Sequence, residues 1–375
     1  MKIHLSLKVV LRIVRLSSTI LFRWPLPPDA KRIDILKHRI VTVFLMFNST
    51  ILSFGLILNV IRSHDDPATF SSSLTDLIAV ISSNLFAIIC EVEADRLHVL
   101  ITEVTMFMKE ATDEESAMVD LYMSKCSLLH SVIIPSAVVG PSLYIIAPTF
   151  LAQPFPGKAA YPFSVEPLWI WASIYASQAI TIFHIGTSLM LNLLFVNMIW
   201  FTVARSEMVC TDIEKAANET DVNKCLRKHQ ELLSFSDKMS TPVRRMACQV
   251  AASNLAAVVF GGLMFTYKWR SFALFDFGML LLFMFFALTQ LFLYAWPADY
   301  LIRSSLRVSE SVLHSQWMEK SPQTRKSLIF MMQRATDPLV IKVDGLLPVL
   351  NLEMFGSALS TSFSYIATLL TIFGN

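Results

Sequence analysis

The chain has 375 residues, of which 54% are hydrophobic and 16% are charged, and its mean hydropathy is +0.55. Soluble domains carry charge on nearer a quarter of their residues, so this composition excludes an ordinary soluble protein and indicates one polytopic membrane domain. The net charge of +2 says little by itself, but the distribution of charge along the chain is informative.

The first 39 residues are basic and precede the first long apolar run. Apolar residues are interrupted by Arg12 and Arg15 over residues 5–22, which predicts a helix lying in the membrane interface rather than crossing it. A regulatory tail is the alternative. Residues 1–39 are therefore assigned to a cytosolic or interfacial N-terminal segment.

Seven apolar runs are long enough to cross a bilayer as helices. They are residues 40–61, 69–90, 127–146, 168–202, 247–267, 272–296 and 350–373. The sequence therefore predicts an all-α polytopic membrane protein. Residues 40–296 would hold six spanning helices, residues 297–349 a cytosolic assembly region, and residues 350–375 the seventh helix.

Lysine and arginine are distributed unevenly between the two sides of the membrane. All of them except Arg62, Lys158, Lys268 and Arg270 fall in segments on the same side as the N-terminus. Because cytosolic loops carry an excess of Lys and Arg, we expect a cytosolic N-terminus and an extracellular C-terminus. Seven helices in that orientation argue against a G-protein-coupled receptor, so no G-protein partner is expected.

The C-terminal run carries hydroxyl side chains along one face of its predicted helix. They cover an arc of about 100° on a helical wheel. These residues, the hydroxyl stripe, are Ser357, Ser360, Thr361, Ser364, Thr368 and Thr371. Hydrocarbon offers hydroxyls no partner, so in a membrane the stripe must face protein or water. It predicts either a tight helix–helix seam or one wall of a water-lined conduction path to which several subunits contribute.

The C-terminal third contains short motifs in a recognisable order. They are Ser311 to Trp317 (SVLHSQW), Lys326 to Arg334 (KSLIFMMQR), Leu352 to Phe355 (LEMF) and Thr361 to Tyr365 (TSFSY). Together with the chain length and the expected topology, they resemble the insect odorant receptor family. A gustatory-type receptor of the same superfamily is an alternative, although Thr371 replaces the Gln of that branch's C-terminal motif.

The resemblance implies a ligand-gated, non-selective cation channel of four subunits, in which the seventh helix of each subunit lines a central pore. It also implies a plasma-membrane protein of sensory neurons. The loop of residues 203–246 lacks the long extra segment of the universal co-receptor, so the chain looks like a ligand-tuned subunit that pairs with that co-receptor. Aligned from Tyr365, the family's gate falls at Thr368, where the family is usually apolar, and its narrow polar position falls at Thr371.

With Ser364 from the hydroxyl stripe, Thr368 and Thr371 are the predicted pore residues. The resemblance also implies an odorant site in the outer half of the bundle, for a small and mostly apolar volatile ligand. Gly140 and Pro141 should kink the third spanning helix and open space beside Tyr144, with simple packing as the alternative. The predicted ligand-binding residues are Leu77, Val80, Ile81, Ser136, Ala137, Gly140, Tyr144, Ser173, Ser177, Ile180, Met264 and Phe265.

Ionisable residues within a bundle are costly and tend to be functional. Here Asp76 is expected to reach the membrane interface, and His184 is expected to be a neutral, hydrogen-bonded histidine. Asp276 is expected to form a local ion pair with Lys268 or Arg270. The residues suggest no metal-ligand cluster and no nucleophile–base pair, so neither an enzyme nor a cofactor is expected. A polytopic transporter is the other alternative, and the lack of inverted repeats argues against it. Expected partners are the co-receptor, the volatile ligand and membrane lipid, but not nucleic acid.

Overall fold

A computed structural model of the chain describes residues 6–20, 24–27, 29–150, 153–268, 274–342 and 349–373. The secondary structure of these residues is helical, without strands, which confirms the all-α prediction. The helices are α1 (Leu7–Ile20), α2 (Arg32–Arg62), α3 (Pro67–Val92), α4 (Ala94–Glu110), α5 (Asp113–Lys125), α6 (Ser127–Ile146), α7 (Leu168–Lys215), α8 (Glu219–Lys268), α9 (Leu274–His314), α10 (Pro322–Ala335) and α11 (Leu352–Phe373), with short 3-10 helices η1 (Ala147–Thr149) and η2 (Trp317–Glu319).

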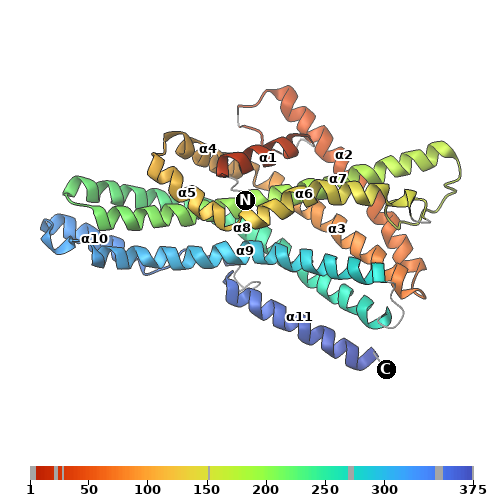
Figure 1. Cartoon of the computed structure of the whole chain (residues 1–375). Helices are drawn as coiled ribbons and strands as arrows, with labels where there is room; N and C mark the ends of the chain where they lie inside the picture. Colours follow the sequence, from red (N-terminus) through yellow and green to blue (C-terminus); the bar gives the residue numbers. More distant parts are fainter. Residues whose placement is uncertain are drawn as a thin grey trace.

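The helix α7 forms the centre of the bundle (Figure 1). Residues 190–204 of α7 are mostly apolar and are buried on every side. A helix of that composition requires neighbours all round, and α7 packs against α2, α5, α6, α8 and α9. At its middle, the fully buried Trp200 meets Trp296 of α9 edge to face, with 5.4 Å between ring centroids.

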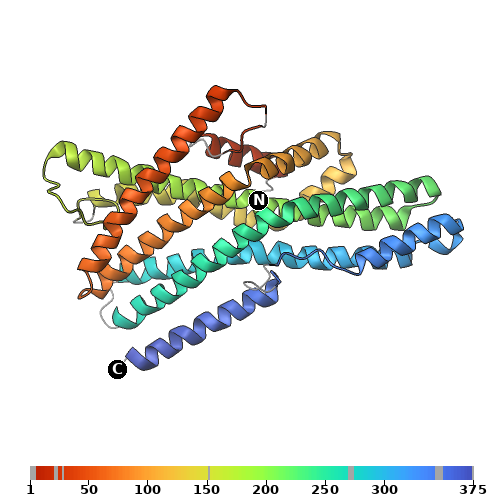
Figure 2. The ribbon, with the colours of Figure 1, turned by 180° about the vertical axis from the view of Figure 1, so that it is seen from behind.

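The helices α7, α8 and α9 are each longer than a bilayer requires. Their extended parts lie together with α10 at one end of the molecule (Figures 1 and 2). There they enclose a second hydrophobic cluster that includes Ile213, Leu232, Val312 and Leu328. The helix α9 continues through Pro297, so residue 297, the predicted start of the assembly region, is not a break in the helix.

Four helices among the described residues are long and apolar enough to cross a membrane, judged by length and composition. They are Arg32–Arg62, Ser72–Val92, Ser127–Thr149 and Leu168–Lys215, which contain most or all of the first four predicted spans. The other three predicted spans lie on α8, α9 and α11, whose side chains are described only in part. Seven crossings and the orientation of the termini therefore stay predictions.

The N-terminal helix α1 is amphipathic, as expected, but protein covers its inward face. Leu7, Val10, Val14 and Ser18 recur at helical spacing and are all buried. The neighbours of α1 are α7 and α5. The expected interfacial helix is thus docked on the bundle by its buried face rather than resting on lipid alone.

The segment between the second and third predicted spans folds into α4 and α5. A capping box starts α5: the Thr112 hydroxyl accepts from the Glu115 N–H at 3.3 Å, and the Glu115 carboxylate accepts from the Thr112 N–H at 3.0 Å. Glu93, at the junction of α3 and α4, is buried and pairs with Arg96 and with Arg245 of α8. The pair of Glu93 and Arg245 ties the α3–α4 junction to α8, and Glu115 of α5 pairs with Lys228 of α8.

Candidate functional site

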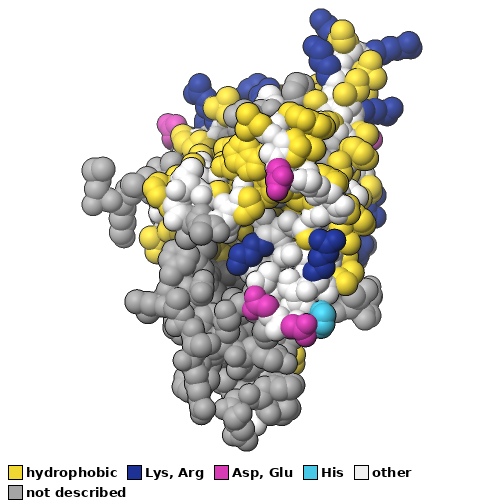
Figure 3. Space-filling view, turned by 90° about the vertical axis from the view of Figure 1, so that its right-hand side faces the viewer, with side chains coloured by type: hydrophobic (Ala, Val, Ile, Leu, Met, Phe, Trp, Pro, Cys, Tyr) yellow, Lys and Arg dark blue, Asp and Glu magenta, His cyan; other side chains and the backbone are white. Residues whose placement is uncertain are grey.

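The segment between α6 and α7, residues 153–167, folds over the opposite end of the bundle from α10 (Figure 1). Asn59 of α2 donates its side-chain amide to the Lys158 carbonyl oxygen at 2.7 Å, and the Gly157 N–H donates to Oε1 of Gln178 on α7 at 2.7 Å. The segment is therefore tied to two spanning helices. Viewed from this end, hydrophobic side chains lie beside a few charged ones (Figure 3).

Aromatic side chains join this segment to α7. The ring centroid of Phe155 lies 5.9 Å from that of Tyr161 and 6.4 Å from that of Trp171, which lies 5.2 Å from Tyr175. Burial raises the pKa of Tyr161, against the effect of the hydrogen bond that Gln178 donates to its hydroxyl at 3.1 Å, so the phenol stays neutral. The sequence-based site omitted these residues, although the density of Phe, Tyr and Trp between residues 150 and 175 is a readable signal.

Asp76 of α3 and Tyr144 of α6 meet in the same half of the bundle. The Tyr144 hydroxyl donates to Oδ1 of Asp76 at 2.7 Å. The other carboxylate oxygen is buried close to the backbone of Gly157. The expectation that Asp76 reaches the membrane interface is thus wrong, because a buried phenol needs a hydrogen-bond partner and this carboxylate supplies it.

Some of the predicted ligand-binding residues face the interior of the bundle. Leu77 and Val80 of α3 are buried in a cluster with Leu52 of α2. Ser177 of α7 donates its hydroxyl to Oδ1 of Asn48 at 2.7 Å. These side chains lie between α2, α3 and α7, near the pair of Asp76 and Tyr144 in the fold.

Other predicted ligand-binding residues do not join that group. Ile81, Gly140 and Ser173 are exposed, while Ser136 and Ile180 are half-buried. Met264 and Phe265 belong to α8, and their side chains lie outside the described part of the chain, as does that of Asp276 on α9. Contact with a ligand stays a prediction for every residue of the set.

The helices α6 and α7 approach closely at Gly186. A Cβ atom on Gly186 would lie 2.5 Å from the carbonyl oxygen of Ala137 and 2.8 Å from Cγ of Pro141. Ala137 and Pro141 therefore pack on α7, whereas a Cβ atom on Gly140 would meet nothing within 4 Å. The open space beside the Gly140–Pro141 pair lies on the exposed side of α6. Two residues before Gly186, His184 is buried as expected.

The helix α11 lies along the side of the bundle, against α8 and α9 (Figures 1 and 2). Met354, Phe355 and Ala358 face the core, and the Phe355 ring lies 5.4 Å from that of Phe292. Every residue of the hydroxyl stripe is exposed on the chain itself. The Thr368 hydroxyl donates to the Ser364 carbonyl oxygen at 2.8 Å, which satisfies its donor within the helix. A seam against another helix of this chain therefore does not cover the stripe.

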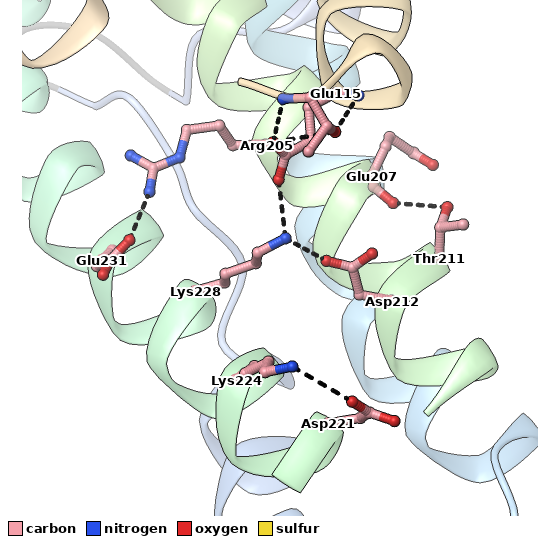
Figure 4. A network of polar contacts seen from close by, with 10 residues as sticks. Glu115, Arg205, Glu207, Thr211, Asp212, Asp221, Lys224, Lys228 and Glu231 are labelled. Atoms are coloured by element: carbon pink, nitrogen blue, oxygen red, sulfur yellow. Dashed lines mark hydrogen bonds and ion pairs between the residues drawn. The ribbon is translucent and has the colours of Figure 1, made fainter. Parts of the chain in front are cut away.

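The end of the molecule that carries α10 contains a network of ion pairs (Figure 4). Lys228 of α8 lies between two carboxylates, with Nζ 2.7 Å from Asp212 of α7 and 2.9 Å from Glu115 of α5. Burial alone would lower the pKa of Lys228, but the hydrogen bonds to Asp212 and Glu115 raise it overall. Arg205 pairs with Glu231 at 3.4 Å. The network links α5, α7 and α8, and it joins residues too distant in sequence to be paired from the sequence alone.

Comparison with known proteins agrees with the resemblance. Residues 67–363 match the family model described as 7tm Odorant receptor. The chain is 33% identical over 91 residues to odorant receptor Or2 of Anopheles gambiae and 30% identical over 91 residues to odorant receptor 10 of Aedes albopictus. Each alignment covers 24% of this chain and 24% of the relative, so the chain spans about a quarter of the length of the curated relatives it matches.

Solved structures share the whole fold. The insect olfactory receptor OR5 from Machilis hrabei, in complex with eugenol, superposes with a TM-score of 0.81 over 99% of both chains, at 16% sequence identity. Another structure of that receptor gives a TM-score of 0.82 over 97% of this chain and 98% of the other. At this identity the likeness establishes the fold alone. The family model, which covers most of the sequence, identifies the chain as a member of the insect odorant receptor family, a family of membrane receptors.

Proposed function

We propose that this chain is the ligand-binding subunit of an odorant-gated, non-selective cation channel. In this proposal it assembles with co-receptor subunits into a tetramer, in the plasma membrane of sensory neurons. The ligand is a small and mostly apolar volatile compound. One α11 helix from each subunit lines the central pore.

The hydroxyl stripe on α11 is the observation that carries this proposal. The stripe is exposed on its own chain, while the opposite face of α11 packs on the core through Phe355 and Ala358. A row of hydroxyls facing lipid would gain no hydrogen bonds beyond those that some of them donate to their own helix backbone. Water in a shared pore supplies the remaining hydrogen bonds to the hydroxyl oxygens. Because one stripe cannot enclose a pore, several subunits have to contribute a helix each.

The opposite end of the bundle from α10 supports a ligand site. Its aromatic residues and the hydrogen-bonded pair of Asp76 and Tyr144 provide apolar surface with a few polar groups, which is the usual character of small-molecule sites. The fold relative from Machilis hrabei was solved in complex with eugenol. From that complex we infer for this chain only the class of ligand, a small organic molecule.

Hydrogen bonds between helices supply a route from this site to α11. The Tyr294 hydroxyl of α9 donates to Oδ1 of Asn192 on α7 at 2.7 Å. Asn254 of α8 donates its side-chain amide to the Ala287 carbonyl oxygen of α9. Both α8 and α9 pack against α11. A ligand that displaces α7 at the proposed site would therefore shift the two helices that support the pore helix.

Current recording tests the proposal. Three sets of cells are compared: cells that express this chain alone, cells that express it with a co-receptor, and cells that express the co-receptor alone. Each set is exposed to the same panel of volatiles. We expect volatile-evoked, non-selective cation current that requires this chain and increases with the co-receptor. Surface-expressed complexes that never conduct beyond the co-receptor alone would contradict the proposal.

A further inference from the structure

A cavity of about 210 Å³ lies where the N-terminal part of α2 passes the junction of α3 and α4. Its apolar lining includes Ile35 and Ala87. None of the residues lining it belongs to the predicted ligand site. It also lies at the end of α3 remote from the segment of residues 153–167, because α3 begins next to that segment and ends at Val92. The cavity is therefore separate from the proposed odorant site.

The rim of the cavity carries both signs of charge. Arg39 and His38 come from α2, while Glu91 and Asp95 come from the α3–α4 junction. Nδ1 of His38 lies 3.8 Å from Oε2 of Glu91. Within the described part of the chain, neither Arg39 nor Asp95 forms an ion pair. A ligand that carries an anionic and a cationic group would pair with both sides of this rim.

Exposed apolar stripes lead away from the cavity along two candidate spanning helices. On α2, Val43 is 67% exposed and Phe47 is 65% exposed, and both share a helix face with Arg39. On α3, Ile88 is 45% exposed and Val92 is 65% exposed, flanking Glu91. These faces suit contact with acyl chains, because α2 and α3 both have the length and composition to cross a bilayer.

We propose that this cavity binds the headgroup of a zwitterionic phospholipid from the leaflet around the N-terminal end of α2. The phosphate faces Arg39, the ammonium faces Glu91 and Asp95, and the acyl chains follow the apolar stripes. The occupant thus joins the cytosolic-side junction of α3 and α4 to the membrane. The proposal depends on the chain being a membrane protein and not on its being a channel.

Native mass spectrometry of the purified full-length chain tests the proposal. The detergent-solubilised chain is incubated with phosphatidylethanolamine, with phosphatidylglycerol of the same acyl chains, or with chain-free glycerophosphoethanolamine. We expect phosphatidylethanolamine to be retained about tenfold more than phosphatidylglycerol, which corresponds to about 1.4 kcal/mol. Glycerophosphoethanolamine should not be retained. Arg39→Gln should weaken retention of both lipids, because both carry the phosphate that faces Arg39. Lys37→Gln, an exposed neighbour outside the cavity, should leave retention of both unchanged.

A second variant keeps the test decisive if Arg39→Gln fails to fold. The double variant Glu91→Gln and Asp95→Asn should reverse the preference toward phosphatidylglycerol, because only the ammonium-binding charges are removed. Size-exclusion elution and melting temperature establish that each variant is folded. Equal retention of both lipids by the unmodified chain would overturn the proposal. So would an unchanged preference in the double variant, or retention of chain-free headgroup equal to that of the lipid.

Discussion

The contact between α6 and α7 can be tested with a matched pair of glycine substitutions. In Gly186→Ala, the new Cβ atom would lie 2.5 Å from the Ala137 carbonyl oxygen, where ordinary contacts begin at 3.4 Å. The two helices would have to separate locally by about 0.9 Å, since a backbone carbonyl within a helix cannot turn aside. In Gly140→Ala, on the neighbouring helix, the same methyl group meets nothing within 4 Å.

The expected energies follow from these distances. Overpacking a well-packed contact costs roughly 1–3 kcal/mol, while replacing a helical glycine by alanine contributes about 0.5–1 kcal/mol. Gly186→Ala should therefore lower stability by about 1–2 kcal/mol, and Gly140→Ala should leave it unchanged or raise it slightly. The two variants carry the same change in composition, so the difference between them isolates the helix contact.

Thermal unfolding of the purified receptor, followed by size-exclusion chromatography after heating, measures this difference. We expect Gly186→Ala to melt a few degrees below Gly140→Ala. A shift in volatile dose–response should accompany it, because α6 and α7 both border the proposed site. A melting temperature for Gly186→Ala equal to or above that of Gly140→Ala would refute the close approach of the two helices.

Three further predictions concern orientation, the ligand site and pH. Asn218 begins a glycosylation sequon, Asn218-Glu-Thr220, between α7 and α8. This segment lies on the predicted cytosolic side, so Asn218 should carry no sugar. A glycosidase-sensitive mass shift that disappears in Asn218→Gln would contradict the predicted orientation. Tyr144→Phe removes the hydroxyl that donates a hydrogen bond to Asp76, at a cost of about 1–3 kcal/mol. This variant should reach the cell surface normally and should shift some volatile dose–response curves roughly ten- to a hundredfold. Unchanged curves would exclude the pair of Tyr144 and Asp76 from the ligand site. Burial, with a contribution from Arg334, lowers the pKa of His229 from 6.5 to about 4. As pH falls below 6.5 the unfolded chain binds a proton that the folded chain does not, so stability should fall between pH 7 and pH 5; His229→Gln should reduce this fall, measured as melting temperature, and an identical pH response in the variant would contradict the assignment.

The helices that are read most directly from the sequence are those whose apolar runs are long and uninterrupted. Runs at residues 40–61, 127–146 and 168–202 lie within α2, α6 and α7, because continuous apolar surface favours helix in a membrane regardless of its neighbours. The residues at which the helices begin and end were less predictable. Hydrophobic contacts in the second cluster, beside α10, such as those of Val312, support α9 well beyond its apolar run, and Pro297 does not end the helix.

Contacts between distant residues decide most of what the sequence left open. Tyr144 and Asp76 are 68 positions apart, and no local pattern pairs them. The inward face of α6 is set by the approach of Ala137 and Pro141 to Gly186, which leaves Gly140 exposed. The hydroxyl stripe of α11 could be predicted because it is a property of one helix. The structure adds that α8 and α9, which pack against α11, leave the stripe exposed.

Cysteine accessibility on α11 tests the central claim most directly, that the hydroxyl stripe faces water in the open channel. A charged, membrane-impermeant thiol reagent is applied from outside to Ser364→Cys, Thr368→Cys and Thr371→Cys, expressed with the co-receptor. Ala358→Cys, on the face that packs against the core, serves as the matched control. The unmodified chain controls for its own free cysteines.

We predict that Thr371→Cys, nearest the end of the helix, reacts readily and that its reaction changes the current. Thr368→Cys should react faster with odorant present than without it, and Ser364→Cys should be the slowest of the three. Ala358→Cys should stay unmodified. If all three stripe cysteines are inert with odorant bound while the receptor still conducts, α11 of this chain does not line the conduction path.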